Sequence, residues 1–429
     1  MRNQHTRSDD PAPEDTASST RSAQPASRRA ASPANGRTSR YPGFHRLPLG
    51  SRVDWLTDMA SLTPEERQLL QSDAPLPLTH ADTMIENAVA VYGLPYALAV
   101  NFVINGTDVI VPMVIEEPSV VAAASHAARL TRSCGGISAD ADPALMPGQI
   151  HITDLSDANA SATRVHNASA RLLAEARHLQ PRMVARGCGA CRVTAQALPD
   201  GSLLVTFIID VGDAMGANAV NSLLEDIAPE VVAVTGGTLG VRIISNLADH
   251  RMAHAHVDIP DRFLASRDHD ASESAERIAQ ASLLATMSTH RAATHNKGVM
   301  NGIDAVALAT GQDWRAIEAG VHAFAAHTGS YQPVTTWHHE SGQLRGRFEA
   351  PIVVGTVGRR IQANPRAALS LKLMGISSAR ELATVMAAVG LAQNLAALRA
   401  LTTEGIQRGH MALHQRYATH QSHADQTRT

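Results

Sequence analysis

The sequence has few cysteines, few aromatic residues and little net charge. Three cysteines among 429 residues are too few for a disulfide framework, which indicates a reducing, cytoplasmic compartment. Aromatic residues make up 3% of the chain, which argues against a base-stacking nucleic-acid surface. The net charge of −3 gives no reason to expect attraction to nucleic acid or to an anionic membrane.

Long apolar runs are also scarce. The most apolar stretch that we considered for a bilayer span, residues 88–104, is interrupted by Gly93, Pro95 and Asn101. The N-terminus has no apolar segment of the signal-peptide kind. We therefore expect neither a membrane span nor a secretion signal.

The first 40 residues are rich in Arg, Ser, Ala, Pro and Asp and show no apolar periodicity, which predicts a disordered tail. An organelle transit peptide is the alternative, but its usual lack of acids is not met, because Asp9, Asp10, Glu14 and Asp15 lie there. The globular part is expected to begin near Tyr41.

The apolar pattern predicts a mixed α/β (α+β) fold. Residues 41–143 and 247–403 are expected to form a large domain of helices and sheet. Residues 144–246 look like a smaller inserted α/β unit with an antiparallel sheet. Within that unit we expect a helix over residues 219–227 and a strand over residues 231–234.

Turn and cap signals mark several elements of the large part. Asn105-Gly106 between two apolar runs predicts a β-hairpin. Thr63 before Pro64 predicts a helix start, with a second helix over residues 80–89. A helix over residues 378–400 is apolar around much of its surface, which indicates a central or interfacial position. Further helices are expected over residues 120–130, 273–286, 314–326 and 365–374, and strands over residues 334–337, 345–350 and 352–354.

One stretch, residues 291–315, surrounds Lys297 with small and amide residues, among them Gly298, Asn301 and Gly302. Tight glycine turns and amide donors around a cation are typical of a site that receives developing negative charge. Asp313 follows, and a carboxylate near the ammonium would keep it protonated. The alternative is an ordinary loop lysine, with Asp313 at a helix N-terminus.

A second candidate lies where a predicted strand ends in two carboxylates and a serine, followed by a helix. Glu117 and Ser119 flank Pro118, and Glu117 is next to the positive end of the helix. Helix capping by Glu117 or Ser119 is the alternative to a functional role.

A third candidate is the turn Asp213-Ala-Met215-Gly216-Ala-Asn218 between a strand and a helix. Such a corner offers backbone N–H groups to an anion, and Gly216 would permit close approach of a phosphate. The G-x-G-x-x-G fingerprint is absent, so an ordinary Rossmann fold is not indicated. The alternative is a simple connection capped by Asn218.

Histidines and cysteines give weaker signals. Three histidines, His250, His254 and His256, include the i, i+4 spacing that could bind a metal on a helix. No acidic or cysteine ligand lies in register with them, so exposed histidines are the simpler interpretation. Cys188 and Cys191 form an isolated C-x-x-C. His410 follows a glycine and suits general acid catalysis, with a surface role or a metal site shared with His414 as alternatives.

Five motifs occur in one order over residues 42–416, and together they resemble class II 3-hydroxy-3-methylglutaryl-coenzyme A reductases, the soluble bacterial form. The motifs are ENAVAVYGLPYALAVNFVINGTDVIVPMVIEEPSVVAAAS, DAMGANAVN, TGGTLGVRIISNLAD, RAATHNKGVMNGIDAVALATGQDWRAIEAG and TEGIQRGHMALH. The resemblance implies reduction of the acyl-CoA to mevalonate and coenzyme A, or the reverse, by two hydride transfers with NAD or NADP.

The resemblance also implies roles for four residues. Lys297 would stabilise the oxyanion at the thioester carbonyl, and Glu117 would exchange a proton with the hemithioacetal or aldehyde oxygen. Asp313 would keep Lys297 charged and link it to Glu117. His410 would protonate the departing coenzyme A thiolate. We expect a buried ammonium and its carboxylate neighbours to meet one carbonyl oxygen across a subunit boundary.

Binding roles follow in the same way. Ser119, Arg291 and Asn301 match positions that hold the carboxylate and hydroxyl of the acid, and Arg291 suits that task through its bidentate fork. Asp213, Met215, Gly216 and Asn218 would contact the dinucleotide in a non-Rossmann small domain. The family implies a homodimer with sites between subunits, no metal, and no nucleic-acid or membrane partner.

Two departures from the family pattern affect these expectations. We expect NAD as the cofactor. Where the family carries an acid that selects NAD, however, this sequence has Gln180 among Arg177, His178 and Arg182, and basic residues there could also accept the 2′-phosphate of NADP. Family members continue past the catalytic histidine as a helical lid, whereas residues 404–429 here predict a truncated lid. We therefore expect reduced turnover, with a catalytically weak relative that retains CoA or dinucleotide binding as the alternative function.

Overall fold

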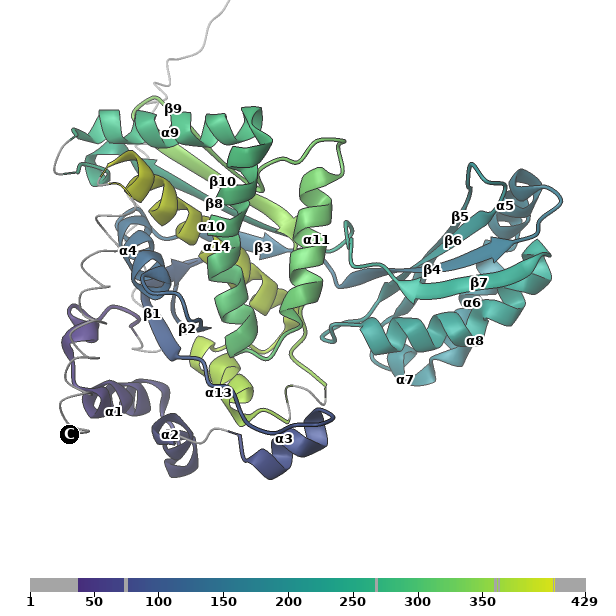
Figure 1. Ribbon diagram of the computed structural model, residues 1–429, viewed down its shortest axis with the longest axis horizontal. Helices are drawn as coiled ribbons and strands as arrows, with labels where there is room; N and C mark the ends of the chain where they lie inside the picture. Colours follow the sequence, from purple (N-terminus) through teal and green to yellow (C-terminus); the bar gives the residue numbers. More distant parts are fainter. Residues whose placement is uncertain are drawn as a thin grey trace, which may run out of the picture. The chain divides into compact units, whose positions relative to one another are not determined.

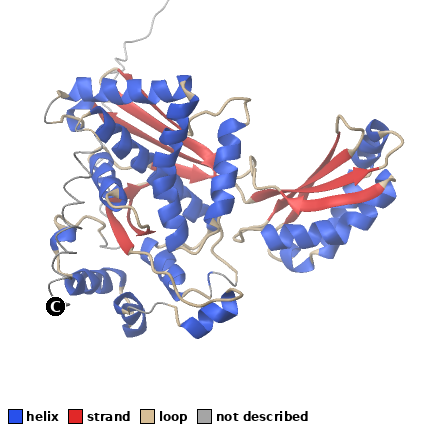
Figure 2. Cartoon of the chain, viewed as in Figure 1, coloured by secondary structure: helices blue, strands red, loops and turns tan. Residues whose placement is uncertain are grey.

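The computed structural model describes residues 38–72, 76–266, 269–358, 361, 363–403 and 405 (Figure 1). The predicted N-terminal tail and the predicted lid therefore lie almost wholly outside the described residues. Helices and strands are both abundant (Figure 2), which confirms the mixed α+β class.

The first hydrophobic core surrounds a four-stranded antiparallel sheet in the order β3-β8-β10-β9. Its strands are β3 (Ser138–Ala141), β8 (Met252–Pro260), β9 (Thr335–Glu340) and β10 (Gln343–Pro351). The predicted hairpin forms a separate pair, β1 (Tyr96–Ile104) and β2 (Thr107–Val114). Asn105 and Gly106 have φ angles of 51° and 78°, the left-handed values that a tight hairpin turn requires. The strand expected over residues 352–354 is wrong, since β10 ends at Pro351.

Most helices of this part lie where the sequence predicts them, with shifts of a few residues, whereas a helix over residues 289–309 spans the stretch around Lys297 where turns were expected. They are α1 (Leu49–Ala60), α2 (Pro64–Gln71), α3 (Leu78–Met84), α4 (Val120–Arg132), α9 (Ala271–Met287), α10 (Thr289–Ala309), α11 (Trp314–Ala326), α13 (Pro365–Met374) and α14 (Ala379–Thr402), with short 3-10 turns at Phe44–Arg46 and Asp261–Phe263. Thr63 caps α2 in a full capping box with Glu66, as expected. The helix expected over residues 80–89 instead ends at Met84.

Helix α14 is the central helix. It packs on β3, β8 and β10 and against α4, α9 and α10 (Figure 1). It is long and apolar enough to cross a membrane, so residues 88–104 were the wrong stretch to single out as the candidate span. However, 78% of its most apolar window is buried inside the structure. Core packing therefore accounts for its apolar surface.

Helices α10 and α14 approach closely through glycine. A Cβ at Gly302 would lie 2.9 Å from Cβ of Gln393 and 3.2 Å from the carbonyl oxygen of Val389. At Gly390 it would lie 3.0 Å from Cδ1 of Ile303. Our expectation of glycine turns around Lys297 was wrong, because Gly302 lies inside a helix and serves close packing. A helical glycine costs about 1 kcal/mol relative to alanine, so this contact must offset that cost.

The second hydrophobic core belongs to another antiparallel sheet, in the order β5-β6-β4-β7, as predicted. Its strands are β4 (Leu145–Thr153), β5 (Gly189–Ala197), β6 (Leu203–Asp210) and β7 (Thr238–Ile244), and its helices are α5 (Ala158–Asn167), α6 (Ser169–Leu179), α7 (Pro181–Val184) and α8 (Ala217–Thr235). The strand expected over residues 231–234 is wrong. These valines continue α8, where Val231 packs in the core. Two cores fit the predicted domain division, whose boundaries remain a prediction.

The histidine triplet does not form a helical metal site. His254 and His256 lie on β8, where they point to the same side as alternate residues of a strand. His250 precedes the strand and contacts Arg192 at 2.7 Å. Among the described residues no group of three metal-binding side chains is found.

A chain of polar side chains joins α10 to α11. Asp304 on α10 hydrogen-bonds to Glu318 on α11, which pairs with His322, and Nδ1 of His322 is 2.7 Å from the Tyr331 hydroxyl. Burial, together with the neighbouring Glu318, raises the pKa of Asp304 well above its ordinary value. The His322 contact lowers the pKa of Glu318. The shared proton therefore resides on Asp304.

This proton makes stability depend on pH. Between the ordinary aspartate pKa of about 4 and the raised folded value, the folded state holds a proton that the unfolded state has lost. The free energy of unfolding should thus fall as pH rises, by at most about 1.4 kcal/mol per pH unit. Asp304→Asn should flatten this slope in urea denaturation at fixed protein concentration. The exposed Asp226→Asn is the control, and an unchanged slope in Asp304→Asn would refute the assignment.

Candidate active site

The structure brings Lys297 and Glu117 into direct contact. Nζ of Lys297 donates to Oε2 of Glu117 at 2.7 Å, although the two residues are 180 positions apart. Glu117 stands in the turn between β2 and α4, and Lys297 stands in the middle of α10. The contact places an ammonium beside a carboxylate, the pair needed for proton transfer next to an oxyanion.

The ammonium is exposed within the single chain, and its expected burial across a subunit boundary stays a prediction. The Lys297 side chain is 60% exposed and that of Glu117 is 36% exposed. Lys297, Asn301 and Asp304 share one face of α10, since they are four and three residues apart. That face is less buried than the opposite face of α10, which packs in the core.

Lysine is rare in this chain, a signal that our reading of the sequence missed. Of 37 basic Lys and Arg residues, only Lys297 and Lys372 are lysines. Both donate to a glutamate, and the partner of Lys372 is Glu66. An ammonium is a compact point charge with rotatable donors, whereas a guanidinium is a planar fork. A lysine at residue 297 in an arginine-rich chain thus points to a role that needs the smaller cation.

Ser119 does not cap α4 with its side chain. Its φ of 78° is left-handed, and the side chain makes no capping hydrogen bond. Its Oγ is buried and lacks a hydrogen-bond partner among the described residues. A strained backbone and an unsatisfied buried hydroxyl both cost free energy, and such costs concentrate where a ligand completes the site. The capping alternative for Ser119 is therefore wrong.

The other predicted residues are placed as follows. Asp313 caps α11, accepting from the Ala316 amide, and pairs with Arg315 at 3.1 Å. Arg291 lies in the first turns of α10, six residues before Lys297 and so about 120° around the helix. Partial burial lowers the pKa of Arg291, which has no ion pair within the described part of the chain. His410 lies outside the described residues.

The Asp213–Asn218 turn lies at the N-terminus of the 19-residue helix α8. The N-cap is Gly216 with φ 110°, not Asn218 as the capping alternative had it. A Cβ at Gly216 would lie 3.0 Å from the Val211 side chain, so only glycine fits without a shift. The first amides of α8, including that of Asn218, have no partner inside the helix. They fit the phosphates of a dinucleotide.

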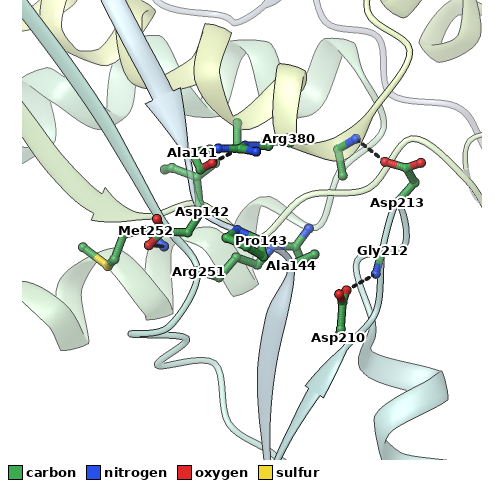
Figure 3. Close-up of a pocket in the computed structure, with 13 residues that line it drawn as sticks. Ala141, Asp142, Pro143, Ala144, Asp210, Gly212, Asp213, Arg251, Met252 and Arg380 are labelled. Atoms are coloured by element: carbon green, nitrogen blue, oxygen red, sulfur yellow. Dashed lines mark hydrogen bonds between the residues drawn. The ribbon is translucent and has the colours of Figure 1, made fainter. Parts of the chain in front are cut away.

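A cavity of about 200 Å³ lies beside this turn (Figure 3). Its charged lining residues are Asp142, Asp210, Asp213, Arg251 and Arg380. Oδ1 of Asp213 accepts from the Ala379 amide at 2.9 Å, which ties the turn to the start of α14 (Figure 3). Neither Lys297 nor Glu117 lines this cavity, so it adjoins the proposed dinucleotide turn rather than the ion pair.

Known proteins resemble this chain over most of its length. A family model for hydroxymethylglutaryl-coenzyme A reductase matches residues 49–415. The 3-hydroxy-3-methylglutaryl-coenzyme A reductase of Archaeoglobus fulgidus is 46% identical over 383 residues, which are 88% of this chain and 86% of that protein. A probable reductase of Borreliella burgdorferi is 34% identical over 332 residues, 77% of this chain and 76% of that protein.

Solved structures agree. The class II reductase of Streptococcus pneumoniae, bound to NADPH in open conformations, superposes with a TM-score of 0.82 at 40% identity. That match covers 85% of this chain and 100% of the pneumococcal chain. The chain therefore belongs to the hydroxymethylglutaryl-coenzyme A reductase family, in its class II, and is an oxidoreductase that interconverts 3-hydroxy-3-methylglutaryl-CoA and mevalonate with a nicotinamide dinucleotide.

Proposed function

We propose that Lys297 and Glu117 are the catalytic pair of this reductase, and their 2.7 Å contact is the observation that supports it most directly. A bound reduced dinucleotide would supply hydride to the thioester carbonyl, and a second one, bound after the oxidised form has left, would supply hydride to the aldehyde. Each hydride transfer turns a carbonyl oxygen into a developing oxyanion. The Lys297 ammonium stabilises that oxyanion through charge and hydrogen bonding, an interaction that is stronger in the transition state than in the ground state.

Glu117 exchanges the proton. Its carboxyl group lies within hydrogen-bond distance of the ammonium, so an oxygen bound there lies within reach of both groups. Asp313 stabilises the charged form of Lys297, and His410 gives a proton to the coenzyme A thiolate as it leaves.

Ser119, Arg291 and Asn301 hold the acid portion of the substrate. The buried Ser119 hydroxyl has an open hydrogen-bonding capacity, and the Arg291 guanidinium forms no ion pair in the described residues. A carboxylate would satisfy both, with the bidentate geometry that arginine favours. Asn301 lies one turn from Lys297, on the same face of α10.

The Asp213–Asn218 turn holds the dinucleotide, with the α8 amides directed at its phosphates. We propose that NADP(H) is the preferred form. No acid occurs between Glu175 and Asp200 to repel a 2′-phosphate. His178 and Arg182 are exposed, whereas Nε of Arg177 is engaged by the Ala190 carbonyl at 3.0 Å.

The assembly is proposed to be a homodimer in the cytoplasm, with each site completed by a second subunit. The largest group of exposed apolar residues in the described part of the chain lies in residues 78–92, where Val89 is 88% and Tyr92 is 87% exposed, and a smaller group lies on α9. Concentrations of this kind mark association surfaces. The Lys297 side chain is 60% exposed in the single chain, so a second subunit would have to cover it if water is to be excluded during hydride transfer.

Replacement of Lys297 tests the catalytic assignment. Lys297→Ala should lower kcat/KM for the acyl-CoA at least about 100-fold, because one oxyanion donor is lost, while dinucleotide affinity is kept. Lys372→Ala removes the other lysine–glutamate pair and should change kcat/KM less than about twofold. Equal effects of the two replacements would contradict the assignment. Isotope-labelled lysine gives two side-chain signals in NMR, and only that of Lys297 should respond to substrate.

Steady-state rates with NADPH and NADH test the cofactor preference. We expect a higher kcat/KM for NADPH. Arg182→Ala should reduce that value about tenfold, the effect of one lost charge-assisted contact of about 1.4 kcal/mol, and leave the value for NADH unchanged. NADH, which lacks the 2′-phosphate, is the internal control. An equal loss with both dinucleotides would show that Arg182 does not bind this phosphate.

Sedimentation velocity tests the dimer. The native protein should sediment at twice the chain mass of 45.5 kDa. A Val89→Glu, Tyr92→Glu double variant should shift it towards the monomer, because buried unpaired carboxylates are costly. Val241→Glu, at a residue 62% exposed on β7, is the control and should remain dimeric. A native monomer at micromolar concentration would refute the proposal.

A further inference from the structure

Arg251 has surroundings that are unusual for an arginine. It precedes β8 and is only 4% exposed, yet no carboxylate lies within ion-pair distance among the described residues. Its guanidinium instead donates to backbone carbonyls of two segments. Nη1 is 3.1 Å from the Met215 oxygen and 3.5 Å from that of Ala214, and Nη2 donates to the Val354 oxygen.

Burial lowers the pKa of Arg251 to about 10, despite Asp210 and Asp213, which act in the opposite direction. A buried cation is costly unless its donors are satisfied. Here the satisfying groups are carbonyls of the Asp213–Asn218 turn itself. The side chain thus fixes the backbone of that turn while its α8 amides stay available to a ligand.

The other side of the turn is fixed by close backbone contact. A Cβ at Gly355 would lie 2.5 Å from the Met215 nitrogen and 3.0 Å from the Ala214 carbonyl carbon. The Asp213 carbonyl also accepts from the Thr356 amide at 2.9 Å. The segment after β10 therefore lies directly against the turn, at a distance that only glycine permits.

Gly355 is in turn held by Gln312. The amide side chain of Gln312 donates to the Gly355 oxygen and accepts from the Gly355 nitrogen, both at 2.9 Å. Gln312 is 6% exposed and immediately precedes Asp313. A continuous set of hydrogen bonds and contacts thus runs from Arg251 through the turn and Gly355 to the residue next to Asp313.

We infer that Arg251 is a positioning residue for the dinucleotide: with Gly355 and Gln312 it locks the Asp213–Asn218 turn in register with the segment that carries Asp313. The inference rests on the proposed function of that turn. It goes further by naming groups that act through the backbone of the turn and so set where the hydride donor stands relative to the carbonyl.

Two variants perturb the turn from opposite sides. Arg251→Lys keeps the charge but loses the fork that reaches both segments. Gly355→Ala keeps every hydrogen-bonding group but pushes a methyl into the turn backbone. Each should raise the Kd and KM for the dinucleotide about tenfold and change the KM for the acyl-CoA less than about twofold. General destabilisation would not produce this split between substrates.

Arg164→Lys is the matched control. Arg164 donates to the carbonyls of Val234 and Thr235 at the other end of α8, so it caps the same helix away from the turn. This variant should leave both KM values unchanged. Wild-type dinucleotide affinity in both Arg251→Lys and Gly355→Ala would overturn the inference, as would a proportionate rise of both KM values.

Asn218→Glu separates this inference from the proposed function beneath it. A carboxylate in the first turn of α8 favours the helix dipole, so folding is kept, but it repels phosphates. If Asn218→Glu binds the dinucleotide normally in calorimetry, the turn is not the dinucleotide site and both statements fail. If Asn218→Glu loses affinity while Arg251→Lys and Gly355→Ala keep it, only the inference fails.

Discussion

The close crossing of α10 and α14 determines where Lys297, the proposed catalytic lysine, stands. Glycines at residues 302 and 390 let the two helices approach until side chains of one touch the backbone of the other. That approach buries one face of α10 against the core helix and leaves the face with Lys297 and Asn301 outside. Because packed cores do not deform continuously, the position of Lys297 opposite Glu117 follows from this contact.

The same geometry explains why the ion pair is open in a single chain. A surface pair of this kind contributes little to stability, so selection for folding alone does not account for it. Hydride transfer needs an ammonium whose charge is not screened by water. The chain supplies the charge and its direction, and the exclusion of water must come from whatever covers that face of α10. A second subunit is the cover that the exposed segment around Val89 and Tyr92 favours.

Local signals in the sequence predicted most elements because their causes are local. The Asn105-Gly106 hairpin and the Thr63 capping box depend on residues within a few positions of each other. Errors arose where tertiary packing decided the outcome. The β-branched residues around Val231 predicted a strand. They instead extend α8, because the buried face of this helix packs on the sheet. We predicted a turn at Gly302 because its packing partners on α14 are distant in the sequence and could not be recognised from it.

The candidate site shows the same division. Glu117, Lys297 and the Asp213–Asn218 turn stand out by residue type, and the sequence could propose their chemistry. It could not show that Ser119 leaves its hydroxyl unsatisfied rather than capping α4, since that depends on a φ angle and on burial. Arg251, Gly355 and Gln312 carry no motif by themselves. Arg251 and Gln312 bind backbone atoms that lie 36, 43 and 103 residues away in the sequence. Every residue has the same backbone atoms, so such partners cannot be recognised from residue types.

Hydrogen bonds to backbone atoms also hold the proposed substrate site and the proposed dinucleotide site in fixed positions relative to each other. A side chain that binds a carbonyl does not depend on the identity of the residue it holds, so Ala214 and Met215 can vary without loss of the link to Arg251. The Gln312 pairing with Gly355 transmits position through a rigid amide-to-backbone pair rather than through a flexible charge. Asp313, as the N-cap of α11, is likewise fixed by a backbone amide. The proposed substrate-side and dinucleotide-side groups are therefore connected through main-chain atoms, which suits a reaction in which hydride must reach the same carbon twice.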